Sequence, residues 1–276
     1  MTQISVLLTC FNRKETTLKC LRQLFAQNEI DKAFKLKIYL VDDGSTDGTG
    51  DAVSREFPTV TVINGNGNLF WNRGMHKAWC AAADKSNDFY MWLNDDTHLF
   101  KNTIITLLET SFKKNNTAII CGSTCSSFDS TQTTYGGVDV AGNFLTPNDA
   151  IQKCDHFVGN CVLIPQSVFE AIGPLDPFFH HAIGDLDYGL RAKKSNIESF
   201  IVPGFIGVCE QHDTLPKWCL AKIPFMERIK SLYSPLGNSH PYYYFVFINR
   251  HYGLFKAIRN YITIHLRVTV PTLWNE

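Results

Sequence analysis

Four short, mostly apolar runs, each followed by polar residues and separated from one another by helical patterns, constrain the fold of this chain more than any other feature. The runs cover residues 4–8, 36–41, 60–63 and 89–93. Continuous apolar runs of this length are typical of strands buried on both faces of a parallel sheet. Apolar residues at helical spacing separate the runs, over residues 15–25, 49–56 and 71–83. The alternation predicts a doubly wound α/β sheet with right-handed crossovers, whose ligands bind beyond the carboxyl ends of the strands.

The second half of the chain is less regular. Its pattern predicts strands over residues 117–121 and 157–164, and helices over residues 166–172 and 187–195. A stretch rich in Ser, Thr and Gly lies between the two strands, and we expect loops or a hairpin there. Beyond Pro203 the composition changes to aromatic and basic residues.

Composition excludes several classes of protein. The chain has 276 residues, 45% of them apolar, and a formal net charge of zero, so nothing draws it globally to nucleic acid. Its nine cysteines are odd in number and form no C-x-x-C pair, which favours free thiols in a reducing cytosol. The first predicted strand begins almost at the N-terminus, and no run of about 18 apolar residues occurs. We therefore expect a cytoplasmic protein without signal peptide or membrane span.

Three acidic clusters share a position at the end of a predicted strand or the start of a predicted helix: Asp42, Asn94-Asp95-Asp96 and Asp185-Leu186-Asp187. Each has a structural interpretation, since Asp commonly caps helices or forms turns. Adjacent carboxylates also repel one another, and a hard cation relieves that repulsion.

Taken together, the motifs resemble glycosyltransferase family 2 over roughly residues 3–215. They are TCFNR at 9–13, VDDGSTD at 41–47, LNDD at 93–96, GNC at 159–161 and GDLD at 184–187. The segment VDDGSTDGT is the most specific of them. The segment GNLFW at 67–71 and the form LNDDTHL resemble the branch of bacterial rhamnosyltransferase-like enzymes.

The resemblance implies an α/β protein with a GT-A fold: a Rossmann-like, mostly parallel central sheet flanked by helices. It assigns residues 1–216 to this domain, with a nucleotide-binding half at 1–100 and an acceptor and catalytic half at 101–216. Residues 217–276 are then a helical C-terminal extension. The implied activity is inverting transfer of a sugar from a UDP- or dTDP-linked donor to a saccharide or lipid-linked saccharide, in bacterial surface polysaccharide assembly.

The resemblance also implies how the donor nucleotide is bound. Thr9, Phe11 and Asn12 match the edge of the base pocket, and Asp42 matches the acid that accepts a hydrogen bond from the pyrimidine imide. In the D-x-D motif, Asn94 and Asp95 belong to the nucleotide site.

The metal and the base follow from the same motifs. Asp96 matches the ligand of a Mg²⁺ or Mn²⁺ ion that bridges the diphosphate, and His212 matches a histidine that completes the metal shell in some members. Asn94 stands where the first Asp of the motif is usual and brings no charge, so we expect weaker metal affinity. Asp185 matches the catalytic base, with Gly184 where Glu is common.

The chemistry suits these residue types. A carboxylate can remove the proton of an attacking hydroxyl, and a divalent cation can neutralise the departing diphosphate. A nicotinamide dehydrogenase would need G-x-G-x-x-G after the first strand, where residues 9–14 contain no glycine. A non-catalytic protein that binds nucleotide sugars or carbohydrate with the same fold stays an alternative.

The C-terminal extension has its own chemistry. Residues 217–276 contain eight Lys or Arg and two Glu, a net charge of +6, among many aromatic residues. This pattern is typical of helices at an anionic membrane surface, and would place the protein peripherally on the inner face of the plasma membrane. A helical subdomain packed on the core, or a homodimer interface, explains the same pattern.

Overall fold

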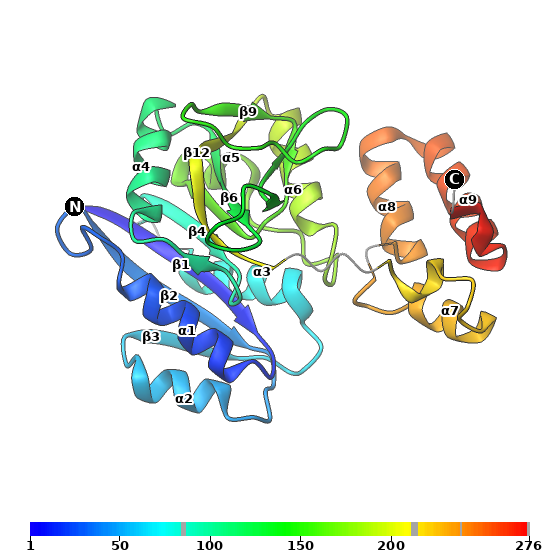
Figure 1. Ribbon diagram of the computed structural model, residues 1–276, viewed down its shortest axis with the longest axis horizontal. Coiled ribbons are helices and arrows are strands. Elements are labelled where there is room, and N and C mark those ends of the chain that lie inside the picture. Colours follow the sequence, from blue (N-terminus) through cyan, green and yellow to red (C-terminus); the bar gives the residue numbers. More distant parts are fainter. Residues whose placement is uncertain (84–86, 211–214, 238, 275–276) are drawn as a thin grey trace.

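A ten-stranded mixed sheet forms the centre of the computed structural model, which describes residues 1–83, 87–210, 215–237 and 239–274. Eight strands follow one another across it (Figure 1): β3 (Val60–Asn64), β2 (Phe34–Asp42), β1 (Thr2–Cys10), β4 (Phe89–Leu93), β11 (Cys161–Pro165), β6 (Ile119–Cys125), β12 (Ser199–Val208) and β5 (His98–Leu99). Two more strands pair beside this path, β7 (Thr133–Tyr135) with β6 and β9 (Gln152–Cys154) with β12.

The strands β1 to β4 are parallel, as the apolar runs predict, and the mostly parallel α/β fold is confirmed. Their register places Cys10 beside Asp42, and Asp42 beside Asn64. Because parallel strands end at the same edge of a sheet, the polar residues that follow them are neighbours in space.

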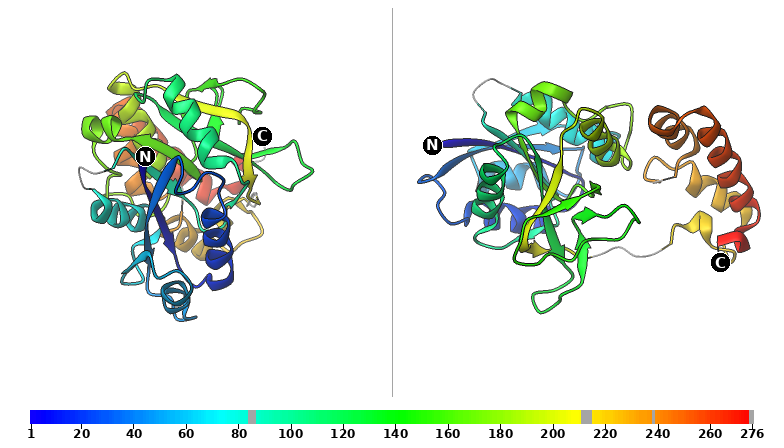
Figure 2. Two further views of the ribbon diagram at one scale, coloured as in Figure 1. Left: turned by 90° about the vertical axis from the view of Figure 1, so that its left-hand side faces the viewer. Right: turned by 90° about the horizontal axis from the view of Figure 1, so that it is seen from above.

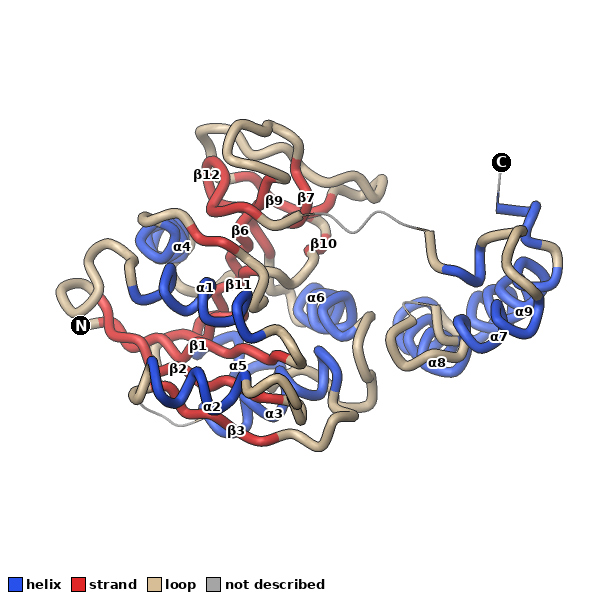
Figure 3. The backbone as a smooth tube through the Cα atoms, turned by 60° about the horizontal axis from the view of Figure 1, so that its bottom comes forward, coloured by secondary structure: helices blue, strands red, loops and turns tan. Residues whose placement is uncertain are grey.

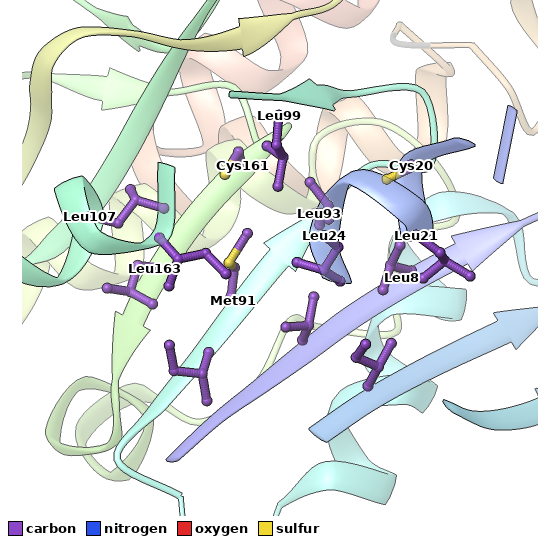
Figure 4. Close-up of a cluster of buried hydrophobic side chains, with 14 of the residues drawn as sticks. Leu8, Cys20, Leu21, Leu24, Met91, Leu93, Leu99, Leu107, Cys161 and Leu163 are labelled. Atoms are coloured by element: carbon purple, nitrogen blue, oxygen red, sulfur yellow. The ribbon is translucent and has the colours of Figure 1, made fainter. Parts of the chain in front are cut away.

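Helices cover both faces of the sheet (Figure 3). One face packs on α1 (Lys14–Phe25), α2 (Thr49–Glu56) and α4 (Thr103–Lys113), and the other on α3 (Phe70–Ala82), α5 (Gln166–Ile172) and α6 (Gly184–Lys194). Strand β1 serves both cores: Leu8 points to the first, shown in Figure 4, and Leu7 to the second. This double burial explains why the strand sequence is apolar at successive positions rather than alternating.

Three predictions for the second half need correction. The strand expected over 157–164 is divided into β10 (His156–Phe157), which pairs with β8 (Gly137–Val138), and β11, because the chain turns at residues 158–160. The helix expected from residue 187 begins at Gly184. The strand expected over 117–121 runs from Ile119 to Cys125.

Strand β12 was not predicted, because Pro203 and Gly204 interrupt its apolar pattern. The structure accommodates them at a shift in register between Ile201 and Phe205, where Gly204 takes a left-handed φ of 67°. A proline is tolerated at such an irregularity because no ladder hydrogen bond is lost there.

The C-terminal residues form helices beside the sheet domain, clearest in Figure 2. They are η1 (Lys217–Cys219), α7 (Phe225–Leu232), α8 (Pro241–Tyr252), α9 (Leu254–Thr269) and η2 (Pro271–Trp274). A small core of their own includes Trp218, Leu232 and Val268, and a second cluster joins Phe247 and Ile248 of α8 to Phe179 and Ile183 of the sheet domain. Within the described part of the chain, no helix combines the length and apolar character needed to cross a membrane.

Candidate active site

The loops after β1 and β2 are fastened to each other by Asn12. Its backbone N–H donates to Ser45 Oγ at 2.9 Å, and its side-chain oxygen accepts from the backbone N–H of Thr46 at 2.7 Å. Asn12 has a left-handed φ of 51°, which Asn tolerates better than most residues. Next to it, the ring of Phe11 is 51% exposed and available to a flat ligand, whereas Thr9 lies beneath α3, close to Gly74.

Asp42 lies at the end of β2, 8% exposed. One carboxylate oxygen accepts from Ser45 N at 2.9 Å and the other from Gly50 N at 3.0 Å, in the first turn of α2. The carboxylate therefore stabilises its own loop, as the turn interpretation expects. It also borders a polar pocket of about 340 Å³ between Ser45, Gly50 and Asn64. Since a carboxylate offers about four acceptor positions, two contacts leave room for a ligand N–H.

The acidic pair after β4 is bound by a cation from the loop after β1. The guanidinium of Arg13 lies 3.1 Å from Asp95 Oδ1 and 2.9 Å from Asp96 Oδ2. Burial raises the pKa of Asp95 to about 6, with Arg13 acting to lower it and Asp96 to raise it further. Sequence reasoning assigned no role to Arg13; the signal was a basic residue directly after the first motif.

Asn94 does not face the acidic pair. Its side-chain oxygen accepts from Trp71 Nε1 at 2.7 Å, and its side-chain nitrogen donates to Asn160 Oδ1 at 3.2 Å. The amide thus joins α3, β4 and the loop before β11. Its side-chain carbonyl, which could have replaced a charged metal ligand, already accepts one hydrogen bond from the indole of Trp71.

Asp185 lies in the first turn of α6, where it was expected just before the helix. Its carboxylate accepts from the backbone N–H groups of Gly159 at 3.1 Å and Leu186 at 2.9 Å. Burial raises the pKa of Asp185, and these two hydrogen bonds counteract the rise. A Cβ at Gly159 would lie 3.2–3.3 Å from the rings of Trp71 and Trp92 and the side chain of Asp185. Close packing of aromatic rings around the carboxylate explains its desolvation.

The structure accounts for the glycine at position 184. A Cβ there would lie 1.8 Å from Asn72 Oδ1. Asn72 is fully buried and its side-chain nitrogen donates to the carbonyls of Asp176 and Phe179. The side chain of Asn72 therefore fills the space that a glutamate at position 184 would need.

Asp187 is not a helix cap, contrary to that interpretation of the sequence. It is fully buried and accepts hydrogen bonds from Arg191 of its own helix and from Arg250 and His251 of α8. Two of these three partners, Arg250 and His251, belong to the C-terminal helices.

The residues near Asp96 suit a divalent ion in part. Two adjacent carboxylates are hard oxygen ligands, and Arg13 brings a single positive charge to them, so the pair keeps negative charge to offer. Within the described ranges, no three His, Cys, Asp or Glu side chains are grouped to hold a metal, and His212 lies outside the described residues. Cys209, whose role sequence reasoning missed, is 3.8 Å from Asp96, and burial raises its pKa to about 12, so it is a neutral thiol there.

A mostly parallel sheet flanked by helices, with a carboxylate pair at the end of β4 and a further carboxylate at the start of α6, defines a GT-A-like α/β fold. The model of Glycosyl transferase family 2 matches residues 5–173, and the chain belongs to that family.

A solved structure, that of S. aureus TarS, shares the fold. It superimposes with a TM-score of 0.57 at 12% identity, over 91% of this chain and 44% of that one. This chain thus spans less than half the length of that relative. No curated protein sequence matches this chain.

Proposed function

We propose that this protein catalyses inverting transfer of a sugar from a UDP- or dTDP-linked donor to a saccharide acceptor in bacterial surface polysaccharide assembly. The observation that carries the proposal is that Asp185 and Asn94, the residue directly before the Asp95–Asp96 pair, are hydrogen-bonded to successive residues of one loop. Gly159 donates to Asp185, and the next residue, Asn160, bonds Asn94 beside the acidic pair. A base and a diphosphate site are thereby held at neighbouring positions.

Each of the site residues then has a role, either in binding the donor or in the transfer itself. The exposed ring of Phe11 stacks on the nucleotide base, Asn12 holds the two loops together, and Asp42 accepts the imide N–H. Arg13 binds the diphosphate and disperses its negative charge. Asp185, ionised, takes the proton of the acceptor hydroxyl as that oxygen attacks the anomeric carbon from the side opposite the diphosphate.

A Mg²⁺ or Mn²⁺ ion at Asp96 would supply Lewis-acid neutralisation of the leaving diphosphate. Asp95 and Asp96 are the described residues suited to hold it, with donor phosphate oxygens as further ligands. Asn94 brings no charge to the motif, which supports weak metal binding before the nucleotide arrives. The segments at 67–71 and 93–99 support a donor of the deoxyhexose kind, as in rhamnosyltransferase-like enzymes.

The C-terminal helices support an acceptor held at a membrane. Helix α9 buries Ala257, Ile264 and Val268, while helical periodicity places Phe255, Ile258, Ile262 and Leu266 on the side away from them. The cations Lys256 and Arg259 flank this exposed apolar stripe. An apolar stripe flanked by cations suits the anionic inner face of the plasma membrane, and a lipid-linked acceptor would be found there. The same stripe in a homodimer is the competing occupant.

The function is tested with a panel of UDP- and dTDP-sugars, by measuring release of nucleoside diphosphate with Mn²⁺, with Mg²⁺ and with excess EDTA. We expect turnover of one donor class, lost in EDTA. Full turnover in EDTA would exclude the metal. Nucleotide binding without turnover of any donor, in the presence of candidate saccharide acceptors, would favour the non-catalytic binding protein.

A further inference from the structure

The C-terminal helices reach the chain on both sides of Asp185. On the C-terminal side the contact is Asp187, whose side chain is fully buried. Arg250 Nη1 and His251 Nε2, both from α8, lie 2.8 Å from Asp187 Oδ1. Arg191, one turn along α6, lies 3.0 Å from Asp187 Oδ2.

Arg250 spans more than this one contact. Its second terminal nitrogen lies 2.8 Å from Asp176, and its backbone carbonyl accepts from Lys194 Nζ at 2.8 Å. Helix α8 thereby contacts both ends of α6, and it also contacts the loop that precedes α6. A fully buried carboxylate needs such partners, because an unpaired charge is strongly unfavourable away from water.

His251 completes the set as a neutral donor. Burial lowers its pKa, and the bond to Asp187 counteracts that change. A neutral imidazole that faces a carboxylate through Nε2 must carry its proton on that nitrogen. The three donors around Asp187 leave its carboxylate no freedom to rotate.

On the N-terminal side of Asp185 the contact is apolar. Ile183 has a left-handed φ of 78°, a conformation that is strained for a β-branched residue. It is 4% exposed and packs in one cluster with Phe247 and Ile248 of α8 and Ala257 of α9. Strained backbone persists where the surrounding packing determines it, and here that packing includes the C-terminal helices.

We propose that the C-terminal helices are a positioning element of the active site: α8 holds Ile183 and Asp187, and so sets the place of Asp185 between them. Arg250, His251 and Phe247 are the positioning residues. The inference rests on the proposed function, in which Asp185 is the base. Any interaction that moves α8 relative to the sheet domain, membrane attachment included, would act on turnover through this contact.

The test combines Arg250→Met with Asp185→Asn. In the otherwise unchanged enzyme, Arg250→Met should lower kcat for nucleoside diphosphate release by about 10-fold or more, because small displacements of a catalytic group are costly. The donor KM should stay within about twofold, because the nucleotide site is on other loops. In the Asp185→Asn background, the same substitution should have little further effect, because Arg250 acts through Asp185.

The matched control is Lys222→Met, which removes an exposed cation from the same C-terminal extension, outside both α8 and the stripe of α9, and it should leave kcat unchanged. Arg250→Lys, which can retain one of the two carboxylate contacts, should recover part of the loss. Should Arg250→Met fail to fold, Phe247→Leu enters the same cycle, since it loosens the packing on Ile183 and leaves Asp187 paired.

The outcomes separate the two claims. Wild-type kcat in a folded Arg250→Met or Phe247→Leu protein, or a loss that is equally large with and without the Asp185 carboxylate, overturns the positioning role alone. Wild-type turnover of Asp185→Asn overturns the base and the positioning role together.

Discussion

Arg13 and Asp96 form an ion pair of 2.9 Å that places an arginine at the position where the leaving diphosphate and its metal are expected. Because Arg13 also contacts Asp95, we expect it to compete with a cation for the pair and to turn to the phosphates once a cation is bound. Arg13→Ala should therefore have opposite effects on two ligands.

Binding of Mn²⁺ alone should become tighter in Arg13→Ala, since a competing positive charge is removed. UDP or dTDP in the presence of Mn²⁺ should bind more weakly by about 1.5–3 kcal/mol, the scale for a hydrogen bond to a charged group. Calorimetry measures both. Arg22→Ala is the control: it breaks an exposed ion pair between Arg22 of α1 and Glu56 of α2, and it should change neither affinity. Weaker binding of both ligands would contradict the competition.

Asp42→Ala should weaken UDP or dTDP binding by about 1–3 kcal/mol through loss of the contact with the imide N–H. The same carboxylate holds Ser45 and Gly50, so a loosened loop could weaken binding as well. Pyrophosphate with Mn²⁺ separates the two causes, because it lacks a base. We expect its affinity to be unchanged, and an equal loss for pyrophosphate and UDP would assign Asp42 to the loop alone.

Asp185→Asn should lower turnover by about 100-fold or more while donor affinity is retained, as for loss of a general base. Asp187 is a poor comparison, since Asp187→Asn disturbs the buried cluster with Arg250. Asp149→Asn, at an exposed loop carboxylate, is the better control and should be fully active. Near-normal transfer by Asp185→Asn would show that another group takes the proton.

The acid side of the pH profile bears on the same residue and on Asp95, whose pKa burial raises to about 6. Burial raises the pKa of Asp185, so its basic form is lost at a higher pH than for an ordinary Asp, near 3.9. Turnover at saturating donor should accordingly fall, as the pH is lowered, before an ordinary carboxyl group would be protonated. A profile that is flat down to pH values near 4 would contradict a buried base.

Two glycines of α6 should respond in opposite ways to alanine. Gly184→Ala places a methyl group 1.8 Å from Asn72 Oδ1 and should lower the free energy of unfolding by about 1–3 kcal/mol. At Gly189 the nearest atom, in Phe157, is 3.4 Å from the added carbon. Gly189→Ala should thus be neutral or stabilising by up to about 1 kcal/mol through helix propensity. Urea unfolding measures the free energy of unfolding of both variants. A Gly184→Ala protein as stable as the wild type would mean that Asn72 can move aside.

The exposed stripe of α9 should bind anionic vesicles in a flotation assay, less so as salt rises. The double variant Phe255→Ser and Ile262→Ser should weaken that binding, because it removes apolar area from the surface. Val140→Ser, at a residue 88% exposed on the sheet domain, is the control and should behave as the wild type. Concentration-dependent dimers without vesicle binding would assign the stripe to a homodimer.

The sequence by itself was sufficient for the parallel strands β1 to β4 and for locating the acidic clusters along the chain. Runs such as residues 4–8 and 89–93 are apolar on both faces, and that local pattern leaves few alternatives to a parallel strand with helices on either side. The polar clusters could be placed at one edge for the same reason, since parallel strands end together. The residues of the family motifs could be assigned by position along the chain alone.

Contacts between distant segments were decided only by the tertiary structure. Nothing near Asp187 in the sequence indicates Arg250, 63 residues later, and nothing near Gly184 indicates Asn72. Likewise, Trp71 donates to the Asn94 carbonyl and Arg13 pairs with Asp95 and Asp96 only because the formed sheet brings these side chains together. Periodicity reports which face of an element is buried, whereas a hydrogen bond or a close approach depends on the positions of two elements, and those follow from the packing of the whole chain.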